Sequence, residues 1–190
     1  QYDILIIGGG LAGLSLACLL GSQNVRVCCI DSCDPEVTKK EEFDGRTTAI
    51  SWASKKVLQK ANVWQRLYSD ACPINDIQIL DGDSPVLLEF FSHEVDNQSF
   101  GWILENHLIR KALYRNIKDN SLINLVAPMN ISDFAIFSDR AEAYADNGQV
   151  FSAPLIIGAD GKNSKTREWM NIPVRGWSYN QNAVSYTHLT

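Results

Sequence analysis

The sequence predicts an α/β domain with a Rossmann-like, mostly parallel sheet. An apolar stretch at residues 2–7 leads through a glycine turn to a helical stretch at 11–21, and a second apolar stretch follows at 25–30. This order is a βαβ unit, whose right-handed crossover makes the two strands parallel neighbours. A later apolar stretch at 155–159 ends in a Gly/Asp turn and supplies a further strand. The 190 residues suffice for one core and part of a second lobe.

The middle of the chain predicts a mixture of short elements. Residues 46–51 lead into a helix at 53–61, and strands at 77–80 and 86–91 flank the turn-forming run Asp81-Gly82-Asp83-Ser84-Pro85. We expect this hairpin to lie outside the domain that contains the parallel sheet. Apolar residues share one face of a predicted helix at 106–117, and a buried strand follows at 122–126.

The last third of the chain predicts an antiparallel meander, then a strand and a helix. Short alternating segments lie at 133–137, 141–145 and 150–152, and Asp146-Asn147-Gly148 favours a tight turn between the last two. The strand at 155–159 precedes a helix at 163–169, for which Asn163 or Ser164 is the expected N-cap.

Charge and hydropathy exclude some classes of protein. The net charge of -5 and the absence of a basic run argue against nucleic-acid binding. The apolar stretch from Ile4 to Leu20 is interrupted by glycines and preceded by Asp3, so it indicates a buried strand and helix, not a membrane span or signal peptide.

The cysteines and histidines favour structural roles. Five cysteines without paired metal-ligand spacing indicate reduced structural thiols in a cytoplasmic protein; a metal or redox cluster of Cys28, Cys29 and Cys33 is the weaker alternative. No Gly-x-Ser-x-Gly elbow or metal-ligand spacing accompanies the histidines, so we expect all three on the surface: His93, His107 and His188. Four aromatic residues favour core packing over the border of an apolar substrate site: Phe90, Phe91, Phe100 and Trp102.

The motif Gly8-Gly9-Gly10-Leu11-Ala12-Gly13 lies where the first strand meets the first helix. In a G-x-G-x-x-G turn the first glycine permits the tight turn, the second the approach of a pyrophosphate, and the third close helix packing. Free N–H groups at the helix start then meet the phosphate charge without a lysine. Gly8, Gly10 and Gly13 are therefore candidate cofactor-binding residues, against the alternative of a purely structural turn.

Two aspartates complete the candidate site. Asp31 ends the second strand, where a carboxylate accepts hydrogen bonds from an adenosine ribose and repels a ribose 2′-phosphate. Asp160 and Gly161 follow the strand at 155–159, at the carboxyl edge where open α/β sheets bind ligands. An antiparallel meander before that strand is untypical of simple NAD domains, which alternate strand and helix, and this favours FAD over NAD.

These motifs together resemble the para-hydroxybenzoate hydroxylase-like flavoprotein monooxygenases. The resemblance rests on residues 8–13, on Asp44-Gly45-Arg46 before residues 47–51, and on residues 158–167. Within that family, Val63-Trp64 and Ile103-Leu104-Glu105-Asn106 look like the ubiquinone-biosynthesis hydroxylases of the 2-octaprenyl-6-methoxyphenol hydroxylase type. The implied fold is an FAD-binding domain of the glutathione-reductase type with a β-meander, at 1–73 and 101–169, plus fragments of a substrate domain at 74–100 and 170–183.

The resemblance also implies roles for individual residues. Arg46 would lie near the phosphate and ribityl side of FAD, and Asn106 would hydrogen-bond the cofactor's sugar chain; the alternatives are a surface charge and a helix N-cap. Asp160 corresponds to an aspartate shared between FAD ribose binding and the path of the reduced nicotinamide. Ser164 and Arg167 complete the Asp-Gly-x-x-Ser-x-x-Arg pattern, in which Arg167 would brace the helix.

The implied activity is hydroxylation of a small phenolic, polyprenylated ubiquinone precursor with FAD, NADH or NADPH, and dioxygen. No metal or amino-acid nucleophile is required, and no catalytic residue is assigned. By analogy, the protein would be cytoplasmic and peripheral to the inner membrane or to a ubiquinone-biosynthesis complex. Family chains continue past this length with a second flavin motif of the Gly-Asp-Ala type, so we expect a fragment that does not turn over alone. Residues 184–190 resemble a vector-derived or assembly-derived tail and not the family's continuation. Another FAD enzyme, such as a reductase or halogenase, and a non-catalytic dinucleotide-binding module remain alternatives.

Overall fold

A parallel sheet of four short strands forms the centre of the fold. The computed structural model describes residues 1–40, 45–80, 82 and 87–181. The strands β1 (Ile4–Ile7), β2 (Val27–Ile30), β8 (Ile123–Val126) and β12 (Leu155–Gly158) pair in the order β12-β1-β2-β8. Every pairing is parallel, and Ile4 faces both Leu155 and Val27. The predicted βαβ unit and Rossmann-like sheet are confirmed.

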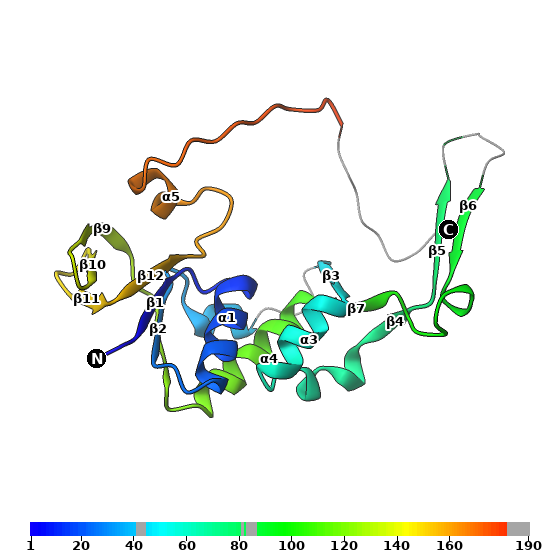
Figure 1. Cartoon of the computed structure of the whole chain (residues 1–190), viewed down its shortest axis with the longest axis horizontal. Helices are drawn as coiled ribbons and strands as arrows, with labels where there is room; N and C mark the ends of the chain where they lie inside the picture. Colours follow the sequence, from blue (N-terminus) through cyan, green and yellow to red (C-terminus); the bar gives the residue numbers. More distant parts are fainter. Residues whose placement is uncertain (41–44, 81, 83–86, 182–190) are drawn as a thin grey trace.

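Helices cover one face of this sheet and the meander covers the other (Figure 1). Helices α1 (Leu11–Ser22), α3 (Trp52–Lys60) and α4 (Asn106–Lys118) lie on the first face. The predicted meander is β9 (Ile131–Ile136), β10 (Ala141–Ala145) and β11 (Val150–Ala153), with antiparallel pairing throughout. The side chains of β2 are buried on both faces, because neighbouring strands and both layers surround it.

The cysteines of β2 contribute to both cores. Strand alternation places Cys28 in the core under the meander and Cys29 in the core under the helices. Burial raises the pKa of the Cys29 and Cys18 thiols to about 12 and that of Cys28 to about 11. These thiols stay protonated at neutral pH, as expected of structural cysteines, whereas Cys33 and Cys72 are exposed.

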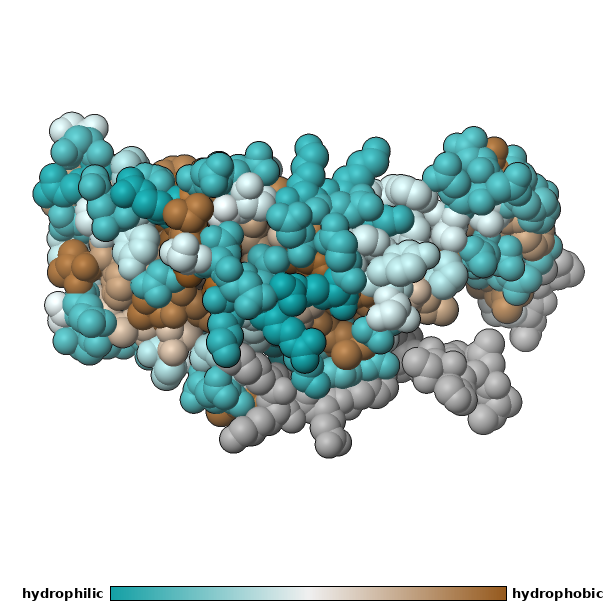
Figure 2. All heavy atoms as spheres, turned by 90° about the horizontal axis from the view of Figure 1, so that it is seen from below, coloured by the Kyte–Doolittle hydropathy of each residue, from teal (hydrophilic) through white to brown (hydrophobic). Residues whose placement is uncertain are grey.

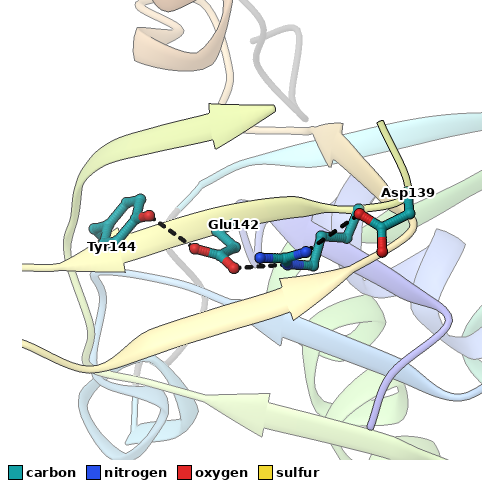
Figure 3. A network of polar contacts seen from close by, with 4 residues as sticks. Asp139, Glu142 and Tyr144 are labelled. Carbon is teal, nitrogen blue, oxygen red and sulfur yellow. Dashed lines mark hydrogen bonds and ion pairs between the residues drawn. The ribbon is translucent and has the colours of Figure 1, made fainter. Parts of the chain in front are cut away.

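The outer face of the meander carries a polar network (Figure 3). Arg140 donates to the carboxylates of Glu142 (2.8 Å) and Asp139 (3.2 Å), and the Tyr144 hydroxyl donates to Glu142 (2.7 Å). The hydrogen bonds from Arg140 and Tyr144 lower the pKa of Glu142, and the bond to Glu142 raises the pKa of Tyr144. These groups are at the surface, so they contribute little to stability.

A second, smaller sheet lies beyond the helices. Its strands β3 (Thr47–Ser51), β7 (Gly101–Glu105) and β4 (Cys72–Ile74) pair antiparallel in the order β3-β7-β4. None of the three strands was predicted; residues 46–51 were expected only to lead into a helix. Two of the strands have weak signals, since β7 begins at a glycine and β4 spans three residues with Pro73 in the middle.

A tryptophan cluster joins this sheet to α3. Trp102 of β7 makes edge contacts with Trp52 and Trp64, at centroid distances of 4.9 and 5.4 Å. The ammonium group of Lys55 lies 3.8 Å from the centre of the Trp102 ring and 4.5 Å from that of Trp52. Trp102 is buried, as predicted for an aromatic residue of the core.

The hairpin of β5 (Asp76–Leu80) and β6 (Leu87–Phe91) projects at the end of the molecule opposite the meander (Figure 1). Its antiparallel pairing was predicted; most of the predicted turn at 81–85 lies outside the described residues. Phe90 is 43% exposed, so the expectation of core packing is wrong for it. A two-stranded ribbon leaves side chains without a layer to pack against.

In Figure 2, hydrophilic residues cover the helical middle of the molecule, and apolar patches show towards both ends.

Short elements complete the fold: α2 (Pro35–Lys40), 3-10 turns at Trp64–Arg66, Tyr68–Asp70 and Ser92–Glu94, and α5 (Lys165–Trp169). Ser164 and not Asn163 caps α5, because its hydroxyl accepts a hydrogen bond from the Arg167 N–H at 3.0 Å.

The predicted surface positions of the histidines are confirmed only in part. His93 is exposed as expected, but the His107 side chain is only 12% exposed, so its predicted surface position is wrong. His107 is the second residue of α4, next to the end of β7, and pairs with Glu105. His188 lies outside the described residues. Across the described chain, none of the helices has both the length and the apolar character needed to cross a bilayer.

Candidate cofactor site

The carboxyl ends of three neighbouring strands form one crevice. Gly8 follows β1, Asp31 follows β2 and Asp160 lies just beyond β12, so parallel pairing brings all three to the same edge of the sheet. A cavity of about 410 Å³ lies there, and Gly8, Gly10, Asp31, Asp160 and Gly161 all line it. The early glycine turn and the distant aspartate thus share a single open site.

The three motif glycines have different surroundings. Gly8 has φ +114°, and a Cβ there would overlap the Ala159 carbonyl and come within 2.7 Å of the Asp160 nitrogen. A Cβ on Gly13 would overlap the Gly8 carbonyl, so the third glycine lets α1 pack on the turn. A Cβ on Gly10 would meet no atom within 4 Å. The first and third glycines are therefore required by packing, and the second borders open space.

The open space lies at the start of α1. Gly10 is the N-cap of this twelve-residue helix and offers no side chain to the free N–H groups of the first turn. A helix N-terminus carries about half a positive charge, and its N–H groups bind anions. The residues present therefore fit a dinucleotide, with a glycine cradle that a side chain would fill and donors suited to a pyrophosphate.

The Asp31 carboxylate is oriented by backbone donors. The Gly9 N–H donates to Oδ2, and the Cys33 N–H donates to Oδ1 at 2.6 Å. The side chain therefore lies against the glycine turn, and each oxygen keeps a second lone pair. That geometry suits a carboxylate that accepts hydrogen bonds from ribose hydroxyls.

The Asp160 carboxylate is held by the segment that leads into α5. Ser164 Oγ donates to Oδ1 at 2.5 Å, and the Thr166 N–H and hydroxyl donate to Oδ2 at 2.9 and 3.1 Å. Burial alone would raise the pKa of this carboxyl, but the hydrogen bonds from Ser164 and Thr166 outweigh it and lower the pKa. Asp160 is thus ionised at neutral pH and fixed in position.

Arg46 and Asn106 lie together, and neither is among the residues that line the crevice. The Asn106 N–H donates to the Arg46 carbonyl at 3.0 Å, next to the paired ends of β3 and β7. Thr48 Oγ1 donates to Asn106 Oδ1 at 2.5 Å. Asn106 is the first residue of α4 and Glu105 is its N-cap, so the alternative of Asn106 as N-cap is not observed.

Several lining residues were not predicted from the sequence. Met129 and Asn130 follow β8, and Cys33, Lys165 and Trp169 close the other sides. Parallel sheets bind ligands at the carboxyl ends of their strands, and β8 is the next strand of the same sheet, so this rule could have indicated Met129 and Asn130.

A larger cavity of about 730 Å³ lies between α2, α4 and β8, but it contains none of the motif residues and no strand-end turn of β1 or β12. The position of the motif residues therefore favours the smaller crevice as the cofactor site.

The fold and this crevice define a dinucleotide-binding α/β domain. A family model described as an FAD binding domain matches residues 1–188, and the chain belongs to this family. This confirms the predicted family resemblance and the FAD-binding fold.

The curated relatives include ubiquinone hydroxylases. The chain is 36% identical to ubiquinone hydroxylase UbiL of Rhodospirillum rubrum, over 97% of the chain and 43% of the relative. It is 28% identical to the 3-demethoxyubiquinol 3-hydroxylase of Escherichia coli, over 96% and 47%. The chain thus spans less than half the length of these relatives.

Solved structures share the fold at low identity. One is PqsL, described as a probable FAD-dependent monooxygenase from Pseudomonas aeruginosa (TM-score 0.76, 21% identity, 94% of this chain and 48% of that chain). Another is the p-nitrophenol 4-monooxygenase PnpA from Pseudomonas putida (TM-score 0.78, 16% identity, 94% and 45%).

Proposed function

We propose that the complete protein is an FAD-dependent aromatic-ring monooxygenase that hydroxylates a phenolic, polyprenylated ubiquinone precursor with NADH or NADPH and dioxygen. The single observation that carries the proposal is the shared crevice of the glycine turn, Asp31 and Asp160. The names of the curated relatives support the substrate class. The short length of the chain relative to them leaves the remaining substrate-binding residues to the rest of the protein.

Each residue of the crevice would bind a different part of the FAD molecule. Gly10 and the first turn of α1 would receive the pyrophosphate, and Asp31 the adenosine ribose. Asp160 and Gly161 would border the other end of the dinucleotide, and Gly13 would keep α1 against the turn. Arg46 and Asn106, held together at the end of the small sheet, would contact the phosphate and sugar chain on the flavin side. Bound FAD would supply the redox and oxygen chemistry.

The domain division and location belong to the same proposal. Residues 1–73 and 101–169 would form the FAD-binding domain, and 74–100 with 170–183 part of a substrate domain. A polyprenylated substrate resides in lipid, so a cytoplasmic protein peripheral to the inner membrane, or bound to a ubiquinone-biosynthesis complex, would reach it. The rival functions are another FAD oxidoreductase and a non-catalytic dinucleotide-binding module.

The test is purification of the complete protein and its titration with substrate. We expect a yellow protein with flavin absorbance, NADH or NADPH oxidation that depends on a prenylated phenol, and one atom of labelled dioxygen in the product. A colourless protein that binds NAD alone would refute the proposal. Flavin binding without phenol-dependent oxidation would favour the rivals.

A matched pair of variants connects that activity to the crevice. Asp31→Asn removes a charged acceptor, and a hydrogen bond to a charged group is worth roughly 1.5–3 kcal/mol, so FAD affinity should fall at least about tenfold. Asp139→Asn removes a carboxylate from the turn between β9 and β10 of the meander (Figure 3) and should leave FAD affinity unchanged. Equal affinities of the two variants would contradict the assignment of Asp31.

A further inference from the structure

The crevice has an unfavourable charge balance for an anionic ligand. Among its described lining residues the charged side chains are Asp31, Asp160 and Lys165. Both carboxylates are fixed by the chain's own donors, and Asp160 is held ionised. A pyrophosphate brings further negative charge into the same space. The partial positive charge at the start of α1 offsets only part of this repulsion.

Among the residues that line the crevice, Lys165 is the cation placed to offset the rest of the repulsion. It lies between Ser164 and Thr166, the two residues that donate to Asp160, so its backbone is anchored beside that carboxylate. It is the first residue of α5, and its side chain is exposed at the crevice. Within the described parts of the chain, Lys165 forms no ion pair that would neutralise it.

A neighbouring lysine provides an internal comparison. Lys162 precedes α5 on the same segment and is exposed like Lys165, but it does not line the crevice. Its carbonyl accepts hydrogen bonds from both terminal nitrogens of Arg167 at 3.2 Å. The backbone of Lys162 therefore holds this segment in place, and the Lys162 side chain takes no part in these bonds. The two lysines therefore differ in position relative to the crevice and not in charge or exposure.

We propose that Lys165 is an electrostatic binding residue for the phosphate groups of the dinucleotide. This inference rests on the proposed function, because it assigns a role within the FAD site. An ammonium group on a flexible stem acts as a point charge for phosphate and needs no fixed hydrogen-bond geometry. Its contribution should therefore depend on charge and on ionic strength, and not on the shape of the side chain.

The experiment is calorimetric titration of FAD into the apo form of the complete protein at about 20 mM and about 500 mM salt, where the Debye length falls severalfold. At low salt Lys165→Gln should weaken binding about two- to fivefold, the range for an exposed ion pair, and Lys165→Glu should weaken it further. Lys165→Arg should bind like the wild type, and Lys162→Gln should show no change. At high salt the differences should shrink towards zero.

The outcomes separate the two proposals. Wild-type protein that fails to bind FAD would refute the proposed function and this role together. Wild-type protein that binds FAD, with Lys165→Gln and Lys162→Gln equal to it, would refute only the role of Lys165. A loss at Lys165→Gln that persists unchanged at high salt, or that Lys165→Arg does not repair, would also overturn it, because the side chain would then act through packing.

Discussion

Substituting alanine at Gly8 or at Gly10 should separate the fold from the cofactor site. At Gly8 an alanine must adopt φ +114°, a conformation that costs roughly 1–3 kcal/mol for residues other than glycine. Its Cβ would also overlap backbone atoms of Ala159, which cannot rotate away as a side chain can. Overpacking of this kind costs roughly 1–3 kcal/mol more, since the ends of β1 and β12 must separate.

The sum predicts a large loss of stability for Gly8→Ala. Roughly 2–6 kcal/mol corresponds to a melting temperature lowered by about 5–20 °C in a domain of this size. Gly10 has φ -71° and open space around it, so Gly10→Ala should cost under about 1 kcal/mol of folding free energy. Its methyl group would enter the space assigned to the pyrophosphate, and FAD affinity should fall at least about tenfold.

The assay is thermal unfolding of both apo variants by circular dichroism, with FAD affinity from fluorescence quenching. A Gly8→Ala protein that melts with the wild type would show that Ala159 does not lock the turn. A Gly10→Ala protein that binds FAD normally would show that the dinucleotide does not approach this glycine.

Three further predictions follow from the contacts. Asp160→Asn should lower stability at pH 7, and because the folded-state pKa lies below its ordinary value of 3.8, the difference from the wild type should disappear as acid titration proceeds below that value. Lys55→Met should cost about 0.5–2 kcal/mol through lost cation–π contacts, with a lower melting temperature, while Lys56→Met should not. Thr48→Val leaves Asn106 Oδ1 without its Thr48 donor and should cost about 1–3 kcal/mol in urea unfolding; an unchanged midpoint would contradict this.

The parts of the fold predicted from sequence are those set by local patterns. The βαβ unit and the meander have apolar runs or alternation with turn residues between them, and their partners are near in sequence. The small sheet was not predicted, because β3 and β7 pair across about fifty residues and β4 is only three residues long. Such pairing depends on which strand edges remain exposed after the helices pack, and no local sequence pattern indicates this.

The sequence could predict where the candidate site lies, but not the hydrogen bonds that hold its carboxylates. The edge rule for parallel strands puts the glycine turn, Asp31 and Asp160 together once the strand order is known. The bonds that fix the carboxylates depend on side-chain rotamers and loop geometry. Ser164 illustrates the gap, because it was expected as part of a pattern and a possible cap, whereas it both caps α5 and holds Asp160.

The site also couples ligand binding to folding, because its parts come from distant segments. Residues 8–10, 31–33 and 160–165 meet only while β1 stays paired with both β2 and β12. A ligand that contacts all three segments binds the folded chain alone and adds about 2.7 kcal/mol of stability at one hundred times its Kd. FAD should therefore raise the melting temperature of the wild type, and raise that of Gly10→Ala much less. A similar rise in both would mean that the ligand stabilises the protein through contacts outside this crevice.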